Sequence, residues 1–242
     1  MSRSTLGSKG GSAWRWRLSP GGLLRELLAR RGTIEAPLYG ESASDLALIR
    51  ETRCRVPLLL SDIAALHVLL CARAAARLGG SMAEAGVLMG GSARLICEVK
   101  GTADLHLFDT FDGPLEEEPG GMSRQAAELR GHFGDISGQL AVVRDLLQPY
   151  PGVCIHSGIF PATASGLKDQ RYSFVHLDMD LASSTRAALD YFHPRLMPGG
   201  ILVGDDYNDP GVAGVFRAFF ASRKDSLIEL PWGQVIVART EG

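Results

Sequence analysis

Several features that would mark particular classes of protein are scarce in this chain of 242 residues. The four cysteines, Cys54, Cys71, Cys97 and Cys154, are widely spaced and form no Cys-x-x-Cys pair, which favours reduced thiols over a disulfide framework. The 25 Lys and Arg residues do not exceed the 27 Asp and Glu residues, so neither nucleic acid nor an anionic membrane is indicated as the main partner.

Long uninterrupted hydrophobic runs are also missing. The most apolar stretch, 56–72, is broken by Ser61, Asp62 and His67, which argues against a membrane span. Ser61 or Asp62 is instead a suitable N-cap for a buried helix over about 61–78. The first twenty residues include basic side chains but no apolar segment of a secretory signal, so we expect a cytoplasmic protein.

What is present is a repeated alternation of strand and helix patterns. Strands are predicted at 81–87, 105–111, 152–158, 174–180 and 199–207, helices at 91–100, 137–148, 183–196 and 212–223, and one or two closing strands within 226–239. Repeated strand–helix units predict an α/β fold with a single doubly wound, mostly parallel sheet that helices cover on both faces.

Two segments stand apart from this alternation. Residues 1–20 are rich in Gly and Ser, so we expect a flexible N-terminal segment, followed by one domain over 21–242. Residues 112–136 contain the run EEEPGG and are too long and polar for an ordinary connection. A substrate lid and a solvated surface insertion are equally compatible with this segment.

The first candidate site residues lie in the glycine-rich stretch EAGVLMGGSA, 84–93. Gly86, Gly90 and Gly91 allow a tight turn and the close approach of a ligand. The stretch is not GxGxxG and no phosphate-loop lysine follows, so an adenosyl ligand without phosphates fits better than a dinucleotide. Glu84 is available to an ammonium group; a plain glycine turn is the alternative.

A second acidic position, Asp109, ends the next predicted strand in LFDTFDG. An acidic residue at this place in a nucleotide-binding α/β fold accepts hydrogen bonds from both ribose hydroxyls. Phe108 or Phe111 could then pack on the base. A helix cap is the competing interpretation of Asp109.

Four further aspartates follow two other predicted strands, in LDMD and GDDY. Asp178 and Asp180 would point to the same side if their strand continued, and Asp205 and Asp206 would crowd them if the strands were neighbours. Like charges so close repel, and a bound Mg²⁺ or Ca²⁺ would relieve the repulsion with oxygen ligands. Asp180 as a helix cap is the alternative. No histidine pattern selects a base, and Trp232 either lines an acceptor pocket or packs in a turn.

Three stretches together resemble the macrocin O-methyltransferase family: MAEAGVLMGGSARLI, LFDTFDGP and FVHLDMDLASSTRAALDYFHPRLMPGGILVGDDYNDPGV. The resemblance covers about 61–220. It implies a class I methyltransferase fold of the Rossmann-like type that uses S-adenosyl-L-methionine and Mg²⁺ to methylate a hydroxyl of a sugar or glycosylated natural product. It also suggests a homo-oligomer that assembles through the N-terminal region, where 21–32 is a candidate helix.

The resemblance assigns roles to individual residues. The implied cofactor-binding residues are Glu84, Gly86, Ser92, Asp109, Phe111, Ser157, Gly158 and Asp178. The implied metal ligands are Asp180, Asp205 and Asp206, with Asp178 as the alternative to Asp180, and one of Asp178 and Asp180 would accept the proton.

Two departures leave the acceptor open. Ala182 stands where the family usually has an aromatic residue, and the helix after GV lacks the acidic residue often found there. A catechol-type O-methyltransferase acting on a small phenol is therefore an alternative. A nicotinamide-dependent oxidoreductase would need the absent GxGxxG turn, and a non-catalytic binding module would lack the aspartates.

Overall fold

The computed structural model describes residues 42–111 and 138–240 of the chain. The chain divides into two compact units, 1–43 and 44–242, and the fold below is that of the second unit. The expectations for 1–20, 21–32 and 112–136 lie outside the described residues.

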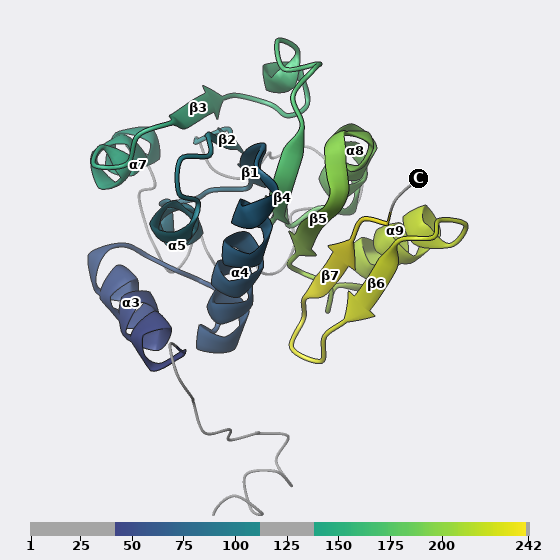
Figure 1. Cartoon of the computed structure of the whole chain (residues 1–242), viewed down its shortest axis with the longest axis horizontal. Helices are drawn as coiled ribbons and strands as arrows, with labels where there is room; N and C mark the ends of the chain where they lie inside the picture. Colours follow the sequence, from purple (N-terminus) through teal and green to yellow (C-terminus); the bar gives the residue numbers. More distant parts are fainter. Residues whose placement is uncertain (1–41, 112–137, 241–242) are drawn as a thin grey trace, which may run out of the picture. The chain divides into compact units, whose positions relative to one another are not determined.

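Seven strands form one sheet in the order β3-β2-β1-β4-β5-β7-β6 (Figure 1). Strands β1 to β5 pair in parallel, whereas β7 is antiparallel to both β5 and β6. The strands are β1 (Ser81–Ala85), β2 (Leu105–Asp109), β3 (Val153–Ser157), β4 (Tyr172–Leu177), β5 (Leu196–Gly204), β6 (Ser226–Glu229) and β7 (Val235–Ala238). The predicted doubly wound, mostly parallel sheet is confirmed, and its closing segment is a pair of strands.

Helices cover both faces of this sheet and bury two apolar layers. One layer lies under α3 (Ser42–Arg55), α4 (Asp62–Ala75), α5 (Gly91–Val99) and α7 (Gln139–Leu147). The other lies under α8 (Ala182–Phe192) and α9 (Pro210–Phe220). Short 3-10 turns complete the described elements: η1 (Ala76–Leu78), η2 (Ala162–Ala164) and η3 (His193–Arg195).

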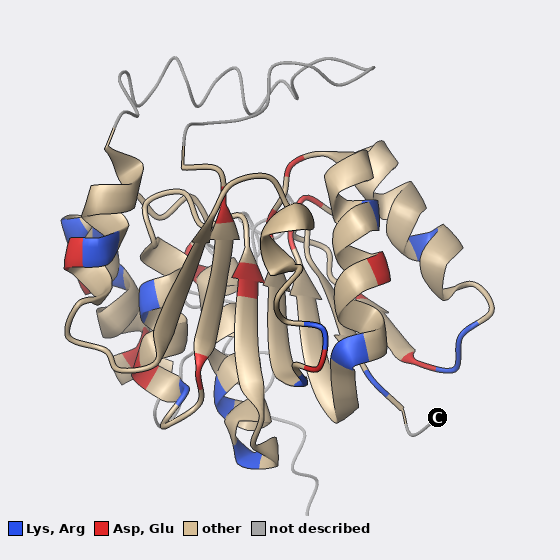
Figure 2. Cartoon of the chain, turned by 90° about the horizontal axis from the view of Figure 1, so that it is seen from above, with Lys and Arg blue, Asp and Glu red and all other residues tan. Residues whose placement is uncertain are grey.

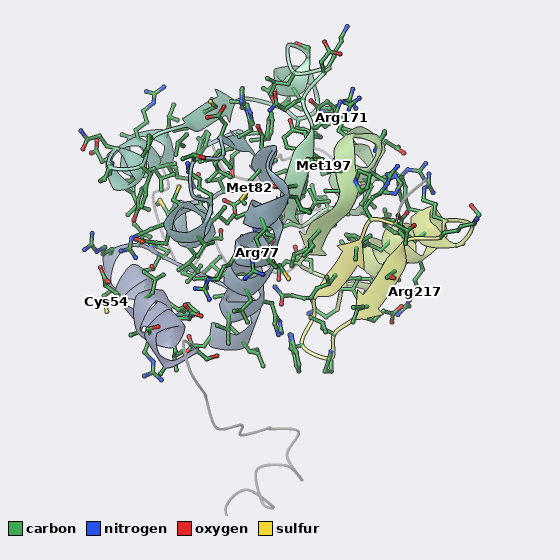
Figure 3. The ribbon with its side chains drawn as sticks, in the orientation of Figure 1. Cys54, Arg77, Met82, Arg171, Met197 and Arg217 are labelled. Atoms are coloured by element: carbon green, nitrogen blue, oxygen red, sulfur yellow. The ribbon has the colours of Figure 1, made fainter. Side chains whose placement is uncertain are left out.

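Side chains alternate between the two layers along each strand, as the pleat requires. Met82, which Figure 3 labels on β1, is fully buried in the layer under α4, while Ala83 faces the layer under α8. By the same alternation Glu84 lies on the α4 side. Its neighbour in the register on β4 is His176, so two buried polar side chains meet beneath α4.

Several predicted boundaries are wrong in informative ways. The strand predicted at 174–180 ends at Leu177, so Asp178 and Asp180 follow the strand and the argument from strand alternation does not apply to them. The strand predicted at 199–207 is β5, which ends at Gly204. Asp180 and Asp206 have φ values of 58° and 57°, a left-handed conformation that no regular strand continues.

The expectation of reduced cysteines is confirmed, because all four are free. Burial raises the pKa of Cys97 to about 12 and that of Cys71 to about 11, so these two thiols remain protonated and unreactive near neutral pH. Within 42–111 and 138–240, no helix is both long and apolar enough to cross a bilayer.

Candidate functional site

The glycine-rich turn after β1 packs directly against the chain that leaves β4. Gly86 has a φ of +86°, and a Cβ at this position would lie 1.7 Å from the carbonyl oxygen of Asp178. Gly90, also left-handed, precedes the first turn of α5, in which Ser92 is buried. The backbone at Gly86 is therefore fixed against the acidic segment, which only a residue without a side chain permits.

Asp109, at the end of β2, holds this turn through its carboxylate. Oδ2 accepts hydrogen bonds from the backbone N–H groups of Val87 (2.6 Å) and Leu88 (3.0 Å). Oδ1 accepts one from the N–H of Phe111 (2.8 Å). Asp109, the residue predicted to bind the ribose, thus lies where β1 and β2 end and holds the backbone of both following loops through hydrogen bonds.

The other predicted nucleoside contacts surround this corner. Phe111 is buried in the apolar layer under α4 and has a φ of 59°. Ser157 is exposed at the end of β3, and the N–H of Gly158 donates to the carbonyl of Asp109 (2.9 Å). Their cofactor contacts stay predictions.

Three buried polar side chains form a hydrogen-bonded row, here called the buried polar chain, from Glu84 on β1 through His176 on β4 to Asp205 after β5. His176 lies between two carboxylates, with Nδ1 2.7 Å from Glu84 Oε1 and Nε2 2.7 Å from Asp205 Oδ2. Burial alone lowers the pKa of His176, but the hydrogen bonds to Asp205 and Glu84 outweigh burial and raise that pKa well above its ordinary value. The two carboxylates therefore favour the imidazolium form of His176, which compensates two acidic groups inside the protein.

The four aspartates after β4 and β5 converge beside this chain, as the sequence predicted. Burial, followed by repulsion from Asp206 and Asp205, raises the pKa of Asp178 well above its usual range. Burial, followed by Asp180 and Asp205, raises the pKa of Asp206 to about 7. The N–H of Asp180 donates to Asp206 Oδ2 (3.1 Å), which joins the two loops. Figure 2 shows acidic residues where strands of the sheet end.

These side chains suit a hard divalent cation. Donor atoms of His176, Asp178 and Asp205 lie within 4.8 Å of one another. Because both ring nitrogens of His176 already face carboxylates, the oxygens of the aspartates are the donors that suit such a cation. This trio shares only Asp205 with the predicted set of Asp180, Asp205 and Asp206, so the assignment of ligands stays a prediction.

The structure tests the interpretation of Asp180 as a helix cap. The N-cap of α8 is Leu181, so Asp180 does not cap that helix. Asp209 caps α9 instead, because its side chain accepts from the N–H groups of Gly211 and Val212. The alternative interpretation of Asp180 as a helix cap is therefore wrong.

Sequence reasoning missed two residues at the edge of this site. Gln234, fully buried at the start of β7, donates from Nε2 to Asp205 Oδ2 (3.3 Å) and accepts at Oε1 near His67 Nδ1 (3.1 Å). In the sequence, His67 stands out only as an interruption in an apolar run. No spacing along the chain could have paired it with Gln234, because 167 positions separate the two residues.

The remaining described histidines lie away from the aspartates. His106 and His156 face each other across β2 and β3, with ring nitrogens 3.0 Å apart, and His156 stacks on Phe108 in the layer under α8. His193 pairs with Asp225 at 2.8 Å. His132 lies outside the described residues. His106 is itself buried.

Three comparisons with known proteins all match methyltransferases. The family described as methyltransferase domain matches residues 83–207. A sugar O-methyltransferase of Streptomyces olivaceus, 8-demethyl-8-(2,3-dimethoxy-alpha-L-rhamnosyl)-tetracenomycin-C 4'-O-methyltransferase, is 32% identical over 141 residues, which is 53% of either chain. The chain thus matches about half the length of this curated relative.

Two solved structures share the fold. The O-methyltransferase NovP superposes with a TM-score of 0.66 at 20% identity, over 83% of this chain and 98% of NovP. The calicheamicin methyltransferase CalS11 gives 0.60 at 16% identity, over 84% of this chain and 94% of CalS11.

The comparisons support an S-adenosylmethionine-dependent O-methyltransferase rather than a nicotinamide-dependent oxidoreductase, and they do not single out the macrocin enzymes. Because the matched region runs from β1 to the loop after β5, it contains the glycine turn, Asp109 and all four aspartates. The chain belongs to the methyltransferase domain family.

Proposed function

We propose that this protein transfers a methyl group from S-adenosyl-L-methionine to a hydroxyl of a sugar or glycosylated natural product, with the help of a divalent cation such as Mg²⁺. The observation that carries the proposal is the gathering of four aspartates against the glycine turn, with Gly86 packed on the backbone of Asp178. The printed name of the Streptomyces olivaceus relative, a 4'-O-methyltransferase of a rhamnosylated compound, supports a sugar acceptor.

The chain's own residues provide the cofactor side of the site. S-adenosylmethionine supplies a methyl group that is already electrophilic. Glu84 is fully buried, and its Oε2 has no hydrogen-bond partner among the described residues, so it suits the ammonium group of the methionine part. Asp109 would hold the ribose through Oδ1, which accepts one backbone N–H and retains acceptor capacity, whereas Oδ2 already accepts two.

The remaining proposed cofactor contacts follow the resemblance. Gly86 and Ser92 would lie along the methionine part, and Phe111, Ser157 and Gly158 would border the adenine. Asp178 would lie between the cofactor and the acceptor.

The metal side consists of the aspartates after β4 and β5. Asp180, Asp205 and Asp206 would hold the cation, with Asp178 as the alternative to Asp180. A divalent cation would lower the pKa of an acceptor hydroxyl and fix its oxygen. Asp178 or Asp180 would accept the hydroxyl proton, since burial raises the pKa of both carboxyl groups. His176 would keep Asp205 oriented from beneath. A cytoplasmic location and a homo-oligomer stay predictions.

The test separates cofactor binding from metal binding. Calorimetry should show S-adenosylmethionine binding to the wild type and to Asp205→Asn and Asp206→Asn with affinities within about twofold of one another. Mn²⁺ binding, read by electron paramagnetic resonance, should be lost in both variants. Methyl transfer to a rhamnoside should also be lost.

The matched control is Asp190→Asn, which removes an exposed carboxylate paired with Arg186 on α8 and should change nothing. Catechol serves as a second acceptor, and transfer to catechol alone would identify the phenol-methylating alternative. Retention of Mn²⁺ binding and full activity in both Asn variants would refute the metal role.

A further inference from the structure

An exposed tryptophan stands at the edge of the acidic site. Trp232 lies in the turn between β6 and β7 and is 37% exposed. The next residue, Gly233, accepts a hydrogen bond at its carbonyl from the N–H of Tyr207 (2.9 Å), which directly follows Asp206. The start of β7 also pairs with the end of β5, Val235 with Gly204. Trp232 is therefore at the same edge of the sheet as the aspartates.

The tryptophan stacks on a histidine from a distant part of the chain. The ring of His67, on α4, lies 5.2 Å from that of Trp232 with an interplanar angle of 24°. Helix α4 leads through η1 into the amino end of β1, so its first turns lie toward the carboxyl edge. Ile63, one turn earlier on the same helix face, is 43% exposed. An apolar surface with two aromatic rings thus borders the site.

This aromatic pair is anchored to the buried polar chain. Gln234 is fully buried, and its amide nitrogen donates to the carbonyl of Ala64 (3.3 Å) and to Asp205 Oδ2 (3.3 Å). Two acceptors on the nitrogen fix the orientation of the amide, so Oε1 must face His67. The ring position of His67 is therefore tied to the carboxylate of Asp205.

The same contacts decide which group is available to a ligand. His67 Nδ1 lies 3.1 Å from Gln234 Oε1 and 3.2 Å from Trp232 Nε1, and one nitrogen can serve only one of them. Because the amide oxygen can only accept, Nδ1 donates to it in one tautomer of His67 and accepts from the indole N–H in the other. In the first tautomer the Trp232 N–H is a donor that an oxygen of a bound molecule can satisfy.

We propose that Trp232 and His67 form an acceptor-binding platform on which a pyranose ring of the substrate stacks, with the Trp232 N–H donating to a ring hydroxyl. The inference rests on the proposed function and adds the residues that select a sugar. A pyranose presents an apolar C–H face and a polar hydroxyl edge, which match the ring face and the N–H of an indole. Because Gln234 joins the platform to Asp205, the bound sugar would lie beside the aspartates.

Binding is tested without relying on turnover. A variant with Trp14→Phe and Trp16→Phe leaves Trp232 as the sole tryptophan and thus a local fluorescent probe. Methyl α-L-rhamnopyranoside, titrated up to its solubility limit, should quench this fluorescence in a saturable manner, and His67→Ala in the same background should weaken the binding. No response to the rhamnoside, or a response to catechol alone, would overturn the proposal.

Kinetics provide the second arm. With the rhamnoside as acceptor, Trp232→Ala should raise the acceptor KM about tenfold, the size expected for losing one aromatic contact and its apolar area. Trp232→Phe retains the ring face but not the N–H and should give an intermediate KM. The matched control Ile228→Ala removes another exposed apolar side chain of the same β-hairpin and should leave KM unchanged.

The two proposals fail in different ways. If the wild type does not bind S-adenosylmethionine in calorimetry, the proposed function is refuted. If the wild type binds it and Trp232→Ala keeps the acceptor KM of the wild type, only the platform is refuted. Binding of S-adenosylmethionine should be the same in Trp232→Ala and wild type, so an altered cofactor affinity would also count against a role confined to the acceptor.

Discussion

Aspartate ends or follows three parallel strands of this sheet, yet the surroundings of these carboxylates differ in electrostatic character. Asp109, after β2, is surrounded by donors, because three backbone N–H groups point at its two oxygens. Asp178 and Asp206, after β4 and β5, are surrounded by other carboxylates, and this repulsion together with burial raises the pKa of each. Asp109 therefore stabilises a loop, whereas the negative charges of Asp178 and Asp206 require a compensating positive charge.

The comparison teaches that burial alone does not identify a functional carboxylate. What matters is whether backbone N–H groups surround the carboxylate, as at Asp109, or other carboxylates do, as at Asp178. His176 compensates Glu84 and Asp205 from within the protein. The remaining negative charge is what a cation would neutralise in the proposed function.

The largest expected effect comes from removing the positive charge of His176. His176→Gln would leave Glu84 and Asp205 buried without a charged partner, so the free energy of unfolding should fall by about 3–5 kcal/mol. Urea unfolding measures this change. The matched control is His156→Gln on β3, which should cost much less because the ring of His156 contacts the His106 and Phe108 rings and no carboxylate among the described residues. A loss below about 1 kcal/mol for His176→Gln would contradict an imidazolium at this position.

A smaller effect is expected at Asp109, whose carboxylate accepts hydrogen bonds from three backbone N–H groups. Asp109→Ala leaves the N–H groups of Val87, Leu88 and Phe111 without their acceptor, which should lower the free energy of unfolding by about 1–3 kcal/mol. Affinity for S-adenosylmethionine, measured by calorimetry, should fall as well because the turn loses its support. Asp109→Asn retains one acceptor oxygen and should lie between wild type and Ala. Unchanged affinity in Asp109→Ala would separate Asp109 from the cofactor site.

The smallest effect is a difference in pH dependence between two regions. Burial lowers the pKa of His156 and, together with the charge of its partner, that of His106, below the ordinary 6.5. A lowered folded-state pKa stabilises the protein above pH 6.5 and loses this contribution on acidification. The aspartates act in the opposite sense, because their raised pKa values favour the folded state as the pH falls.

Melting temperatures measured as a function of pH can separate the contribution of the histidine pair from that of the aspartates. His156→Gln should show a smaller drop in Tm than the wild type between about pH 7.5 and about pH 5.5. The difference should be modest, because His156 is only partly buried and solvent screens its charge. An equal or larger drop in the variant would show that the histidine pair does not set this dependence.

Much of the fold could be read from the sequence because local patterns carry it. Hydrophobic alternation predicted each central strand and helix, and the glycines at 86, 90 and 91 predicted the turn. The gathering of Asp178, Asp180, Asp205 and Asp206 followed from placing β4 beside β5. Strand ends were less predictable, because Asp180 and Asp206 adopt left-handed conformations that no hydrophobic pattern reveals.

The sequence by itself determined the order of the elements, the aspartates that follow two of the strands and the glycine turn, because each depends on residues close together along the chain. Only the sheet order, which places β4 beside β5, brings the two aspartate pairs together. Only the tertiary structure decided that His176 lies between Glu84 and Asp205, and that His67 from α4 meets Trp232 from the β6–β7 turn. These partners are far apart in sequence, and their pairing depends on the register of the sheet and the packing of α4 on it. Charge compensation and the aromatic surface are therefore properties of the folded chain.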